Sequence, residues 1–193
     1  TGNVYIAGIE ENSEGISIAK YWKNGEAFAL SDGKHNTYAK SIFVKGDDVY
    51  IAGFEQNSDE TTYALFWKNG TRELLSNGNT WAITESIFVS PDDDIYIVGY
   101  EYPFIEMPAA VLWKNKIKTN LPFSTEASYA SAVVVDGKDV YIAGYDYVGN
   151  AEWNAKYWRN NEEVFLQKGS ENSFTTGIAV LNGDVYLSGN HYS

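Results

Sequence analysis

Short stretches of mostly apolar residues recur along the chain, and clusters of glycine, asparagine, aspartate or proline separate them. The clearest stretch is 49–55, Val-Tyr-Ile-Ala-Gly-Phe-Glu. Nearly the same seven residues return at 4–10, 95–101 and 140–146, and a degraded copy lies at 185–191. The stretches are short and rich in β-branched and aromatic residues, and nothing between them has helical periodicity. The pattern therefore predicts an all-β fold.

The copies are evenly spaced. Their marker tyrosines are Tyr5, Tyr50, Tyr96, Tyr141 and Tyr186, with steps of 45, 46, 45 and 45 residues. A fixed internal period of this length is typical of proteins in which each repeat is one supersecondary unit. The period therefore predicts a repeat architecture.

Each repeat contains four expected strands, here called positions a to d. Position a covers 38–44, 83–89, 129–135 and 174–180, and a tight Gly-, Asp- or Pro-containing turn follows it. Position b is the tyrosine motif. Position c has a tryptophan at its centre, and position d ends at a leucine. The tryptophans are Trp22, Trp67, Trp113 and Trp158, and the leucines are Leu30, Leu75, Leu121 and Leu166. We expect four antiparallel strands per repeat.

Glycines at two places in the repeat carry structural information. Position b always contains one, at residues 8, 53, 99, 144 and 189. Glycine within a strand weakens it, so its recurrence indicates a bulge or a close approach of another backbone segment. Between positions c and d, Asn24-Gly25 and Asn69-Gly70 predict two-residue type I′ hairpins, in which both central residues need positive φ.

The tyrosine-glycine-glutamate motif and the tryptophan-lysine-asparagine-glycine motif resemble those of β-propeller repeat proteins, in particular uncharacterised bacterial ones with blades of about 45 residues. The resemblance covers essentially the whole chain. It implies a single β-propeller domain over 1–193, built of four-stranded antiparallel blades. The marks of WD40 blades are missing, so the partners of that family are not implied. An open solenoid has a similar period, but the small residues Ser41, Ser86, Ala132 and Gly177 at one point of position a favour a ring. In that ring the tryptophans pack between blades, where truncation of one to alanine costs roughly 3 to 5 kcal/mol.

The number of blades stays open. The strands run b, c, d, then three full sets, then a and b, which makes seventeen. Four blades use sixteen, with 174–180 completing the first blade and 185–189 left as a spare strand. The alternatives are a five-unit ring or an arc of a larger propeller, and the surplus strand favours these. In each case the bare terminal edges need a cover, from each other or from another chain.

Composition narrows the classes of partner. The formal net charge of −12 opposes binding to nucleic acid or to an anionic membrane surface. Apolar runs fall far short of the ~20 residues that cross a bilayer. There is no cysteine, so disulfides and thiolate metal sites are excluded. The chain starts at Thr1 without a leader sequence, which indicates a processed form or a cut segment. We expect a secreted or cell-surface protein.

Four equally long loops between positions b and c differ in content. They span 9–18, 54–63, 100–109 and 145–154, and they contain ten acidic residues and no lysine or arginine: Glu10, Glu11, Glu14, Glu55, Asp59, Glu60, Glu101, Glu106, Asp146 and Glu152. Such a rim attracts cations, whether a basic peptide, an amine or Ca²⁺, although solubility explains it equally well. Glu10, Glu55, Glu101 and Asp146 occupy one repeat position, so a ring of carboxylates is expected. No calcium-loop motif accompanies it, and we predict neither a metal nor a cofactor.

The same face carries aromatic residues. Tyr102, Phe104, Met107, Tyr147 and Trp153 lie in the third and fourth loops, and Trp81 reaches this face from a connection between positions d and a. Aromatic faces beside carboxylates suit sugars and peptide anchors alike, although the loops could equally pack on themselves. The predicted ligand-binding residues are Glu10, Glu55, Trp81, Glu101, Tyr102, Phe104, Asp146, Tyr147 and Trp153.

Catalysis has little support in the sequence. No cysteine nucleophile exists, and the two histidines, His35 and His191, each occur once, in a turn and a tail. The sequence therefore favours a non-enzymatic recognition module for a carbohydrate or a protein segment. The alternatives are a structural subunit that contacts partners through blade edges and a glycan-cleaving enzyme with paired carboxylates.

Overall fold

The computed structural model describes residues 2–57, 61–102, 107–123, 126–149, 152–166 and 172–192. These residues form seventeen strands. Their bounds are β1 Tyr5–Glu11, β2 Ser17–Lys23, β3 Glu26–Ala29, β4 Thr37–Lys45, β5 Asp48–Gln56, β6 Thr62–Lys68, β7 Thr71–Leu74, β8 Trp81–Val89, β9 Ile95–Tyr102, β10 Ala109–Lys114, β11 Ile117–Asn120, β12 Ala127–Asp136, β13 Asp139–Tyr147, β14 Trp153–Arg159, β15 Glu162–Phe165, β16 Asn172–Leu181 and β17 Asp184–Tyr192. The all-β prediction is confirmed. No helix long and apolar enough to span a membrane occurs in the described residues.

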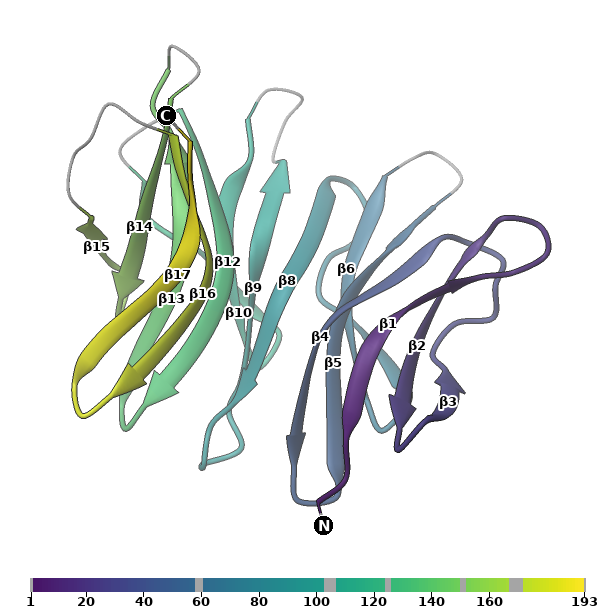
Figure 1. The fold of residues 1–193 in the computed structure, drawn as a ribbon. Helices are drawn as coiled ribbons and strands as arrows, with labels where there is room; N and C mark the ends of the chain where they lie inside the picture. The colour runs from purple at the N-terminus through teal and green to yellow at the C-terminus, as the bar shows by residue number, and fades with distance from the viewer. Residues whose placement is uncertain are drawn as a thin grey trace.

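The strands form five antiparallel sheets in chain order. Sheet I is β1-β2-β3, sheet II β4-β5-β6-β7, sheet III β8-β9-β10-β11, sheet IV β12-β13-β14-β15 and sheet V β16-β17. Figure 1 shows them side by side. The position a strands contact one another in succession, β4 with β8, β8 with β12 and β12 with β16. Position a is thus the inner edge of every sheet that has one, as the small residues at position a indicated.

The closed four-blade alternative is wrong. It requires residues 174–180 to pair with the first sheet, but within the described residues β16 pairs only with β17, and β1 pairs only with β2. Sheets I and V lie at the two ends of the row of sheets (Figure 1). The described residues therefore form a row of three complete sheets between two partial ones.

The glycine of position b is explained by a bulge in position a. In each complete sheet, position a carries one extra residue directly opposite this glycine, for example between Ala130 and Ala132 in β12. A Cβ built on Gly144 would lie 2.2 Å from the carbonyl oxygen of Tyr129, and one on Gly53 would lie 2.0 Å from that of Tyr38. Only glycine accepts so close a carbonyl, so both readings of this glycine are confirmed.

The position c tryptophans link neighbouring sheets. Trp67, Trp113 and Trp158 are fully buried. Trp67 Nε1 donates to the carbonyl oxygen of Leu30 in the preceding repeat at 2.9 Å, and Trp158 Nε1 donates to that of Pro122 at 2.7 Å. Trp22 lies in sheet I, the first of the described sheets, and is only partly buried. The tryptophans are structural, as expected.

The turns between positions c and d also follow the sequence. Asn24 and Asn69 have φ of 53° and 51°, and Gly25 and Gly70 have φ of 89° and 80°. Two successive residues with positive φ define the type I′ turn. Asn69 Oδ1 in addition accepts a hydrogen bond from the backbone N–H of Val49 at 2.8 Å, which ties the turn to the start of position b.

Candidate functional site

The four acidic residues expected to form a ring on the loops lie within strands. Glu10, Glu55, Glu101 and Asp146 belong to β1, β5, β9 and β13, each of which runs further than the sequence pattern indicated. Each carboxylate faces a basic side chain of its own sheet: Glu10 pairs with Lys20, Glu55 with Arg72 at 2.7 Å, Glu101 with Lys118 at 2.5 Å, and Asp146 with Lys156 at 2.6 Å. These four residues are thus balanced by cations that the loop sequences do not contain.

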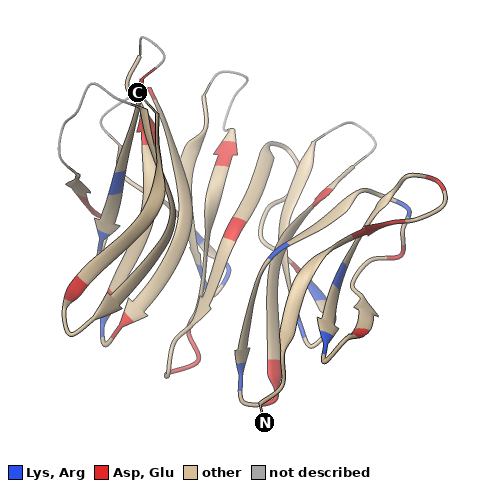
Figure 2. Ribbon diagram, in the orientation of Figure 1, with Lys and Arg blue, Asp and Glu red and all other residues tan. Residues whose placement is uncertain are grey.

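The burial of two of these carboxylates also contradicts the predicted ring. Glu101 is 5% exposed and Asp146 is fully buried, so neither presents an open carboxylate at a rim. Acidic residues occur at both ends of the sheets (Figure 2). Of the ten loop acids, Asp59, Glu60 and Glu106 lie outside the described residues. No cluster of three or more metal-ligating side chains is found in the described part of the chain.

The cation that faces the acid switches strand from repeat to repeat. In sheet IV it is Lys156 of position c, whereas in sheet II it is Arg72 of position d, and Leu65 occupies the position equivalent to Lys156. Sheet III has the same arrangement as sheet II: Val111 is equivalent to Leu65, and Lys118 of position d is equivalent to Arg72. In every complete sheet the acid at this repeat position thus faces a base, and in sheet IV a second acid, Glu163, contacts the same base, which indicates a structural role for these ion pairs.

The predicted aromatic residues form part of a larger aromatic band. Trp81 and Tyr102 are edge-on at 6.1 Å between ring centroids, and Tyr147 and Trp153 lie 5.0 Å apart. Trp153 also contacts Tyr129 at 5.6 Å. Phe104 lies outside the described residues. The structure thus places four of the five predicted aromatic side chains along one band.

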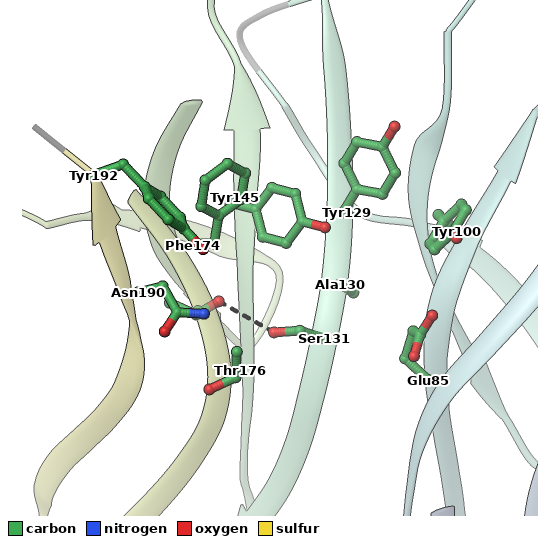
Figure 3. A pocket seen from close by; sticks show the side chains of 11 residues that line it. Glu85, Tyr100, Tyr129, Ala130, Ser131, Tyr145, Phe174, Thr176, Asn190 and Tyr192 are labelled. Atoms are coloured by element: carbon green, nitrogen blue, oxygen red, sulfur yellow. Dashed lines mark hydrogen bonds between the residues drawn. The ribbon is translucent and has the colours of Figure 1, made fainter. Parts of the chain in front are cut away.

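The centre of the band lines a groove of about 520 Å³ across the inner strands of sheets III, IV and V. We call it the aromatic groove. Its aromatic members are Tyr100, Tyr129, Tyr145, Phe174 and Tyr192, and its polar members include Glu85, Ser131, Thr176 and Asn190. Figure 3 shows these side chains lying around one open space. A groove of this size accommodates a small ligand or part of a chain-like one.

The aromatic rings of the groove contact one another in sequence. Tyr100 and Tyr129 meet edge-on at 4.8 Å, Tyr129 stacks on Tyr145 at 5.0 Å, and Tyr145 meets Phe174 at 5.0 Å. Tyr129 and Tyr145 are directly opposite each other in the β12–β13 register. Since cross-strand aromatic pairs stabilise each other, these rings are held in place before a ligand arrives.

Three of the polar side chains come from the bulges. The extra residues of β8, β12 and β16 are Glu85, Ser131 and Thr176, and all three line the groove. The extra residue of β4 is Lys40, whose Nζ lies 2.9 Å from the carboxylate of Glu85. A bulge turns one side chain away from the regular alternation of a strand. The same irregularity therefore brings four chemically different residues toward the inner side of the sheets.

Three tyrosines of the groove, Tyr100, Tyr129 and Tyr145, keep their protons. Burial, followed by the negative charge of Glu85, raises the pKa of Tyr100 and of Tyr145 above the ordinary range. Burial and a hydrogen bond with Tyr102 likewise raise the pKa of Tyr129. Neutral phenols both donate and accept hydrogen bonds, so the groove combines apolar ring faces with hydroxyl groups.

The sequence pattern alone did not identify these groove residues. Tyr100 and Tyr145 directly follow the recurring glycine, where the first repeat has Ile9, and Glu85 occupies the bulge opposite that glycine. The sequence feature that could have identified them is the change of residue type from repeat to repeat at positions next to a constant glycine. These variable positions lie at the inner edge of the sheets and not in the loops.

Comparisons with known proteins bear on the fold. A scan against protein-family models and a search of curated proteins give no match. Among solved structures, a polysaccharide lyase described as an ulvan lyase matches with a TM-score of 0.64, at 12% identity over 97% of this chain and 62% of its own. A Bacillus subtilis arabinanase matches with a TM-score of 0.52, at 10% identity over 98% of this chain and 85% of its own. The fold is that of a β-propeller.

A third propeller match is a fucose lectin from Kordia zhangzhouensis, solved with methyl-fucoside. Its TM-score is 0.50 at 10% identity, over 66% of this chain and 97% of its own. At these identities the likeness concerns the fold alone, since propellers host unrelated functions. This chain spans less than two thirds of the lyase, and its sheets correspond to blades of a propeller.

Proposed function

We propose that this propeller is a non-enzymatic binding module for carbohydrates, that it acts at or outside the cell surface, and that the aromatic groove is its site. The observation that carries the proposal is the groove itself, in which stacked and edge-on rings alternate with hydroxyl, amide and carboxylate groups. Sugars present apolar C–H faces and polar hydroxyls on one molecule. A surface that offers ring faces and hydrogen-bonding groups side by side complements both.

The groove is extended and crosses three sheets, which suits an oligosaccharide. Along the band, ring contacts run from Trp81 through Tyr102 and Tyr100 to Tyr129. A chain of sugar units lying along these rings would meet an aromatic surface at successive positions. The predicted residues Trp81, Tyr102, Tyr147 and Trp153 would then flank or support the site, while the groove residues make the central contacts.

Binding without cleavage is favoured by the carboxylates of the groove. Glycoside hydrolysis of the common kind uses two carboxyl groups, separated by roughly 5 to 10 Å, on either side of the scissile bond. The groove lining within the described residues includes one, Glu85. A chromogenic glycoside tests the alternative: turnover that disappears in a Glu85→Gln variant would favour a cleaving enzyme.

We expect Tyr192→Ala to weaken binding of an oligosaccharide at least about tenfold, because aromatic side chains supply much of the binding energy in such sites. Tyr192 lines the groove and is 60% exposed, so truncation leaves the core intact. Calorimetric titration with the best-binding oligosaccharide from a glycan array measures the change.

The matched control is Tyr186→Ala on the same strand. Tyr186 is 54% exposed and does not line the groove. This variant should bind like the parent protein. Equal losses in both variants would point to a general effect on β17, and no loss in either would place the site elsewhere.

A second candidate function, a subunit of a larger assembly, has its own supporting observation. Ile6 in β1 is 57% exposed, whereas Ile51, its equivalent in sheet II, is 1% exposed. Tyr186 in β17 is similarly open, whereas Tyr141 in sheet IV is 4% exposed. These apolar side chains lie on terminal strands with one free edge each, and such edges readily pair with another chain.

If edge pairing holds an assembly together, the molar mass in solution exceeds that of one chain. Replacing Ile6 and Ile9 in β1 by lysine should then shift the mass measured by light scattering towards the monomer, because charge at an edge opposes pairing. A mass equal to one chain at all concentrations would contradict this candidate function. That result would leave the binding proposal untouched.

A further inference from the structure

The aromatic groove has one charged residue in its described lining. Glu85 stands among Tyr100, Tyr129 and Tyr145, and the remaining lining residues are uncharged. Figure 3 shows its carboxylate on the open space opposite Ser131 and Thr176. A single carboxylate among aromatic faces gives the groove a preference for positively charged groups.

Both components of this arrangement attract cations. The face of an aromatic ring is electron-rich and attracts an ammonium group, with an effect that grows when the cation is desolvated. A carboxylate accepts charge-assisted hydrogen bonds from the same group, which are about twice as strong as neutral ones. An anionic sugar would bring a second negative charge beside Glu85, in a protein whose net charge is −12.

Lys40 competes for the same carboxylate. Its Nζ lies 2.9 Å from Glu85, with the lysine side chain 38% exposed and the glutamate side chain 25% exposed. A pair this open to solvent is weak, so the remaining lone pairs of Glu85 stay accessible to a ligand. Lys40 therefore modulates the charge of the groove and does not abolish it.

We infer that the preferred ligand is an amino sugar, with a free ammonium group directed at Glu85 and a ring face against Tyr129 and Tyr145. This inference rests on the carbohydrate-binding function proposed above and names its substrate class. Glu85 is then the specificity-determining residue, and Lys40 is the residue that limits its effect.

The experiment uses two matched probes, oligomers of β-1,4-linked glucosamine and the same oligomers N-acetylated. Acetylation removes the positive charge and keeps the sugar backbone. Calorimetric titrations at mildly acidic pH, where the amines are protonated, compare the parent protein with Glu85→Gln and Lys40→Met. Thermal unfolding checks that both variants remain folded, as expected for a partly exposed ion pair.

We expect opposite effects of the two variants on one probe. Glu85→Gln should weaken binding of the glucosamine oligomer about tenfold, and Lys40→Met should strengthen it about two- to fivefold. The N-acetylated oligomer should change less than about twofold in either case. The double variant Lys40→Met with Glu85→Gln should still bind the glucosamine oligomer more weakly than the parent protein. Because it also removes the repulsion from Lys40, the loss that remains measures the missing carboxylate alone.

The outcomes separate the two levels of the proposal. Equal binding of both oligomers, with Glu85→Gln affecting them alike, would overturn the amino-sugar inference and leave carbohydrate binding intact. Preferential binding of uronic-acid oligomers would also overturn it. If no oligosaccharide binds at all, the proposed function fails and this inference fails with it.

Discussion

Replacing Lys156 by alanine is expected to lower the free energy of unfolding by about 3 to 5 kcal/mol. Lys156 is fully buried, and its Nζ lies 2.6 Å from Asp146 and 2.5 Å from Glu163. The ammonium also lies 4.3 Å from the centroid of the Trp158 ring. Removing it takes the positive charge away from a fully buried carboxylate, for which water is not available. Urea denaturation of the variant and the parent protein measures the difference.

The neighbouring sheet provides the matched control. At the three equivalent positions sheet II has Leu65, Arg72 and Glu55, which replace the base and two acids of sheet IV by one acid and one base. Transferring this set into sheet IV by Lys156→Leu, Glu163→Arg and Asp146→Glu should recover most of the lost stability. Two results would contradict this prediction. One is a loss of less than about 1 kcal/mol in Lys156→Ala, and the other is a triple variant that is no more stable than Lys156→Ala.

Gly144→Ala should cost about 3 kcal/mol or more, because its Cβ would lie 2.2 Å from the carbonyl oxygen of Tyr129 and 2.4 Å from the ring of Trp158. Neither the bulge of β12 nor a buried tryptophan can move away without disturbing the contacts between sheets. The substitution should also distort the groove, since Tyr129 and the bulge residue Ser131 line it. The loss is measured by chemical denaturation.

The control for this prediction is Gly8→Ala, at the same repeat position in sheet I. Within the described residues that sheet consists of β1, β2 and β3, and a Cβ on Gly8 would meet only the far end of the Trp22 ring, at 3.3 Å. We expect a change within about 1 kcal/mol. Similar losses at both positions would mean that the glycine is needed for some property of the strand other than the bulge opposite it.

The strands and sheets could be predicted from the sequence because each repeat supports the same assignment of strand positions. One tryptophan flanked by apolar residues says little, but four such tryptophans at a constant interval place Trp22, Trp67, Trp113 and Trp158 at one strand position. In the structure each is paired with the isoleucine of position b in its sheet, Trp67 with Ile51 for example. Turn chemistry at Asn69-Gly70 was predictable for the same reason, since positive φ restricts the choice of residue.

Ring closure and the site were less predictable. Strand composition does not reveal whether β16 pairs with β1 or with β17, because both candidates have the same sequence pattern. The acids at 55, 101 and 146 looked like loop residues because position b continues further than its apolar core. Their partners lie ten or seventeen residues away on another strand.

The groove residues were not predictable from the alternation of apolar and polar residues along a strand, because bulges interrupt that alternation. A bulge shifts the register of position a by one residue and thereby turns Glu85 and Ser131 toward the inner side of the sheets. The recurring glycine indicated a bulge but not which residue it would expose. That residue follows only from the paired register of the two strands.

The most direct test of the aromatic groove is nuclear magnetic resonance of tyrosine-labelled protein during titration with an oligosaccharide. The chain has fifteen tyrosines, so the rings can be assigned by single substitutions to phenylalanine. We predict shifts for the tyrosines that line the groove and none for Tyr50, Tyr96 and Tyr141, which are buried within the sheets. Saturating ligand that leaves the groove tyrosines unchanged, or shifts tyrosines elsewhere instead, would contradict the account.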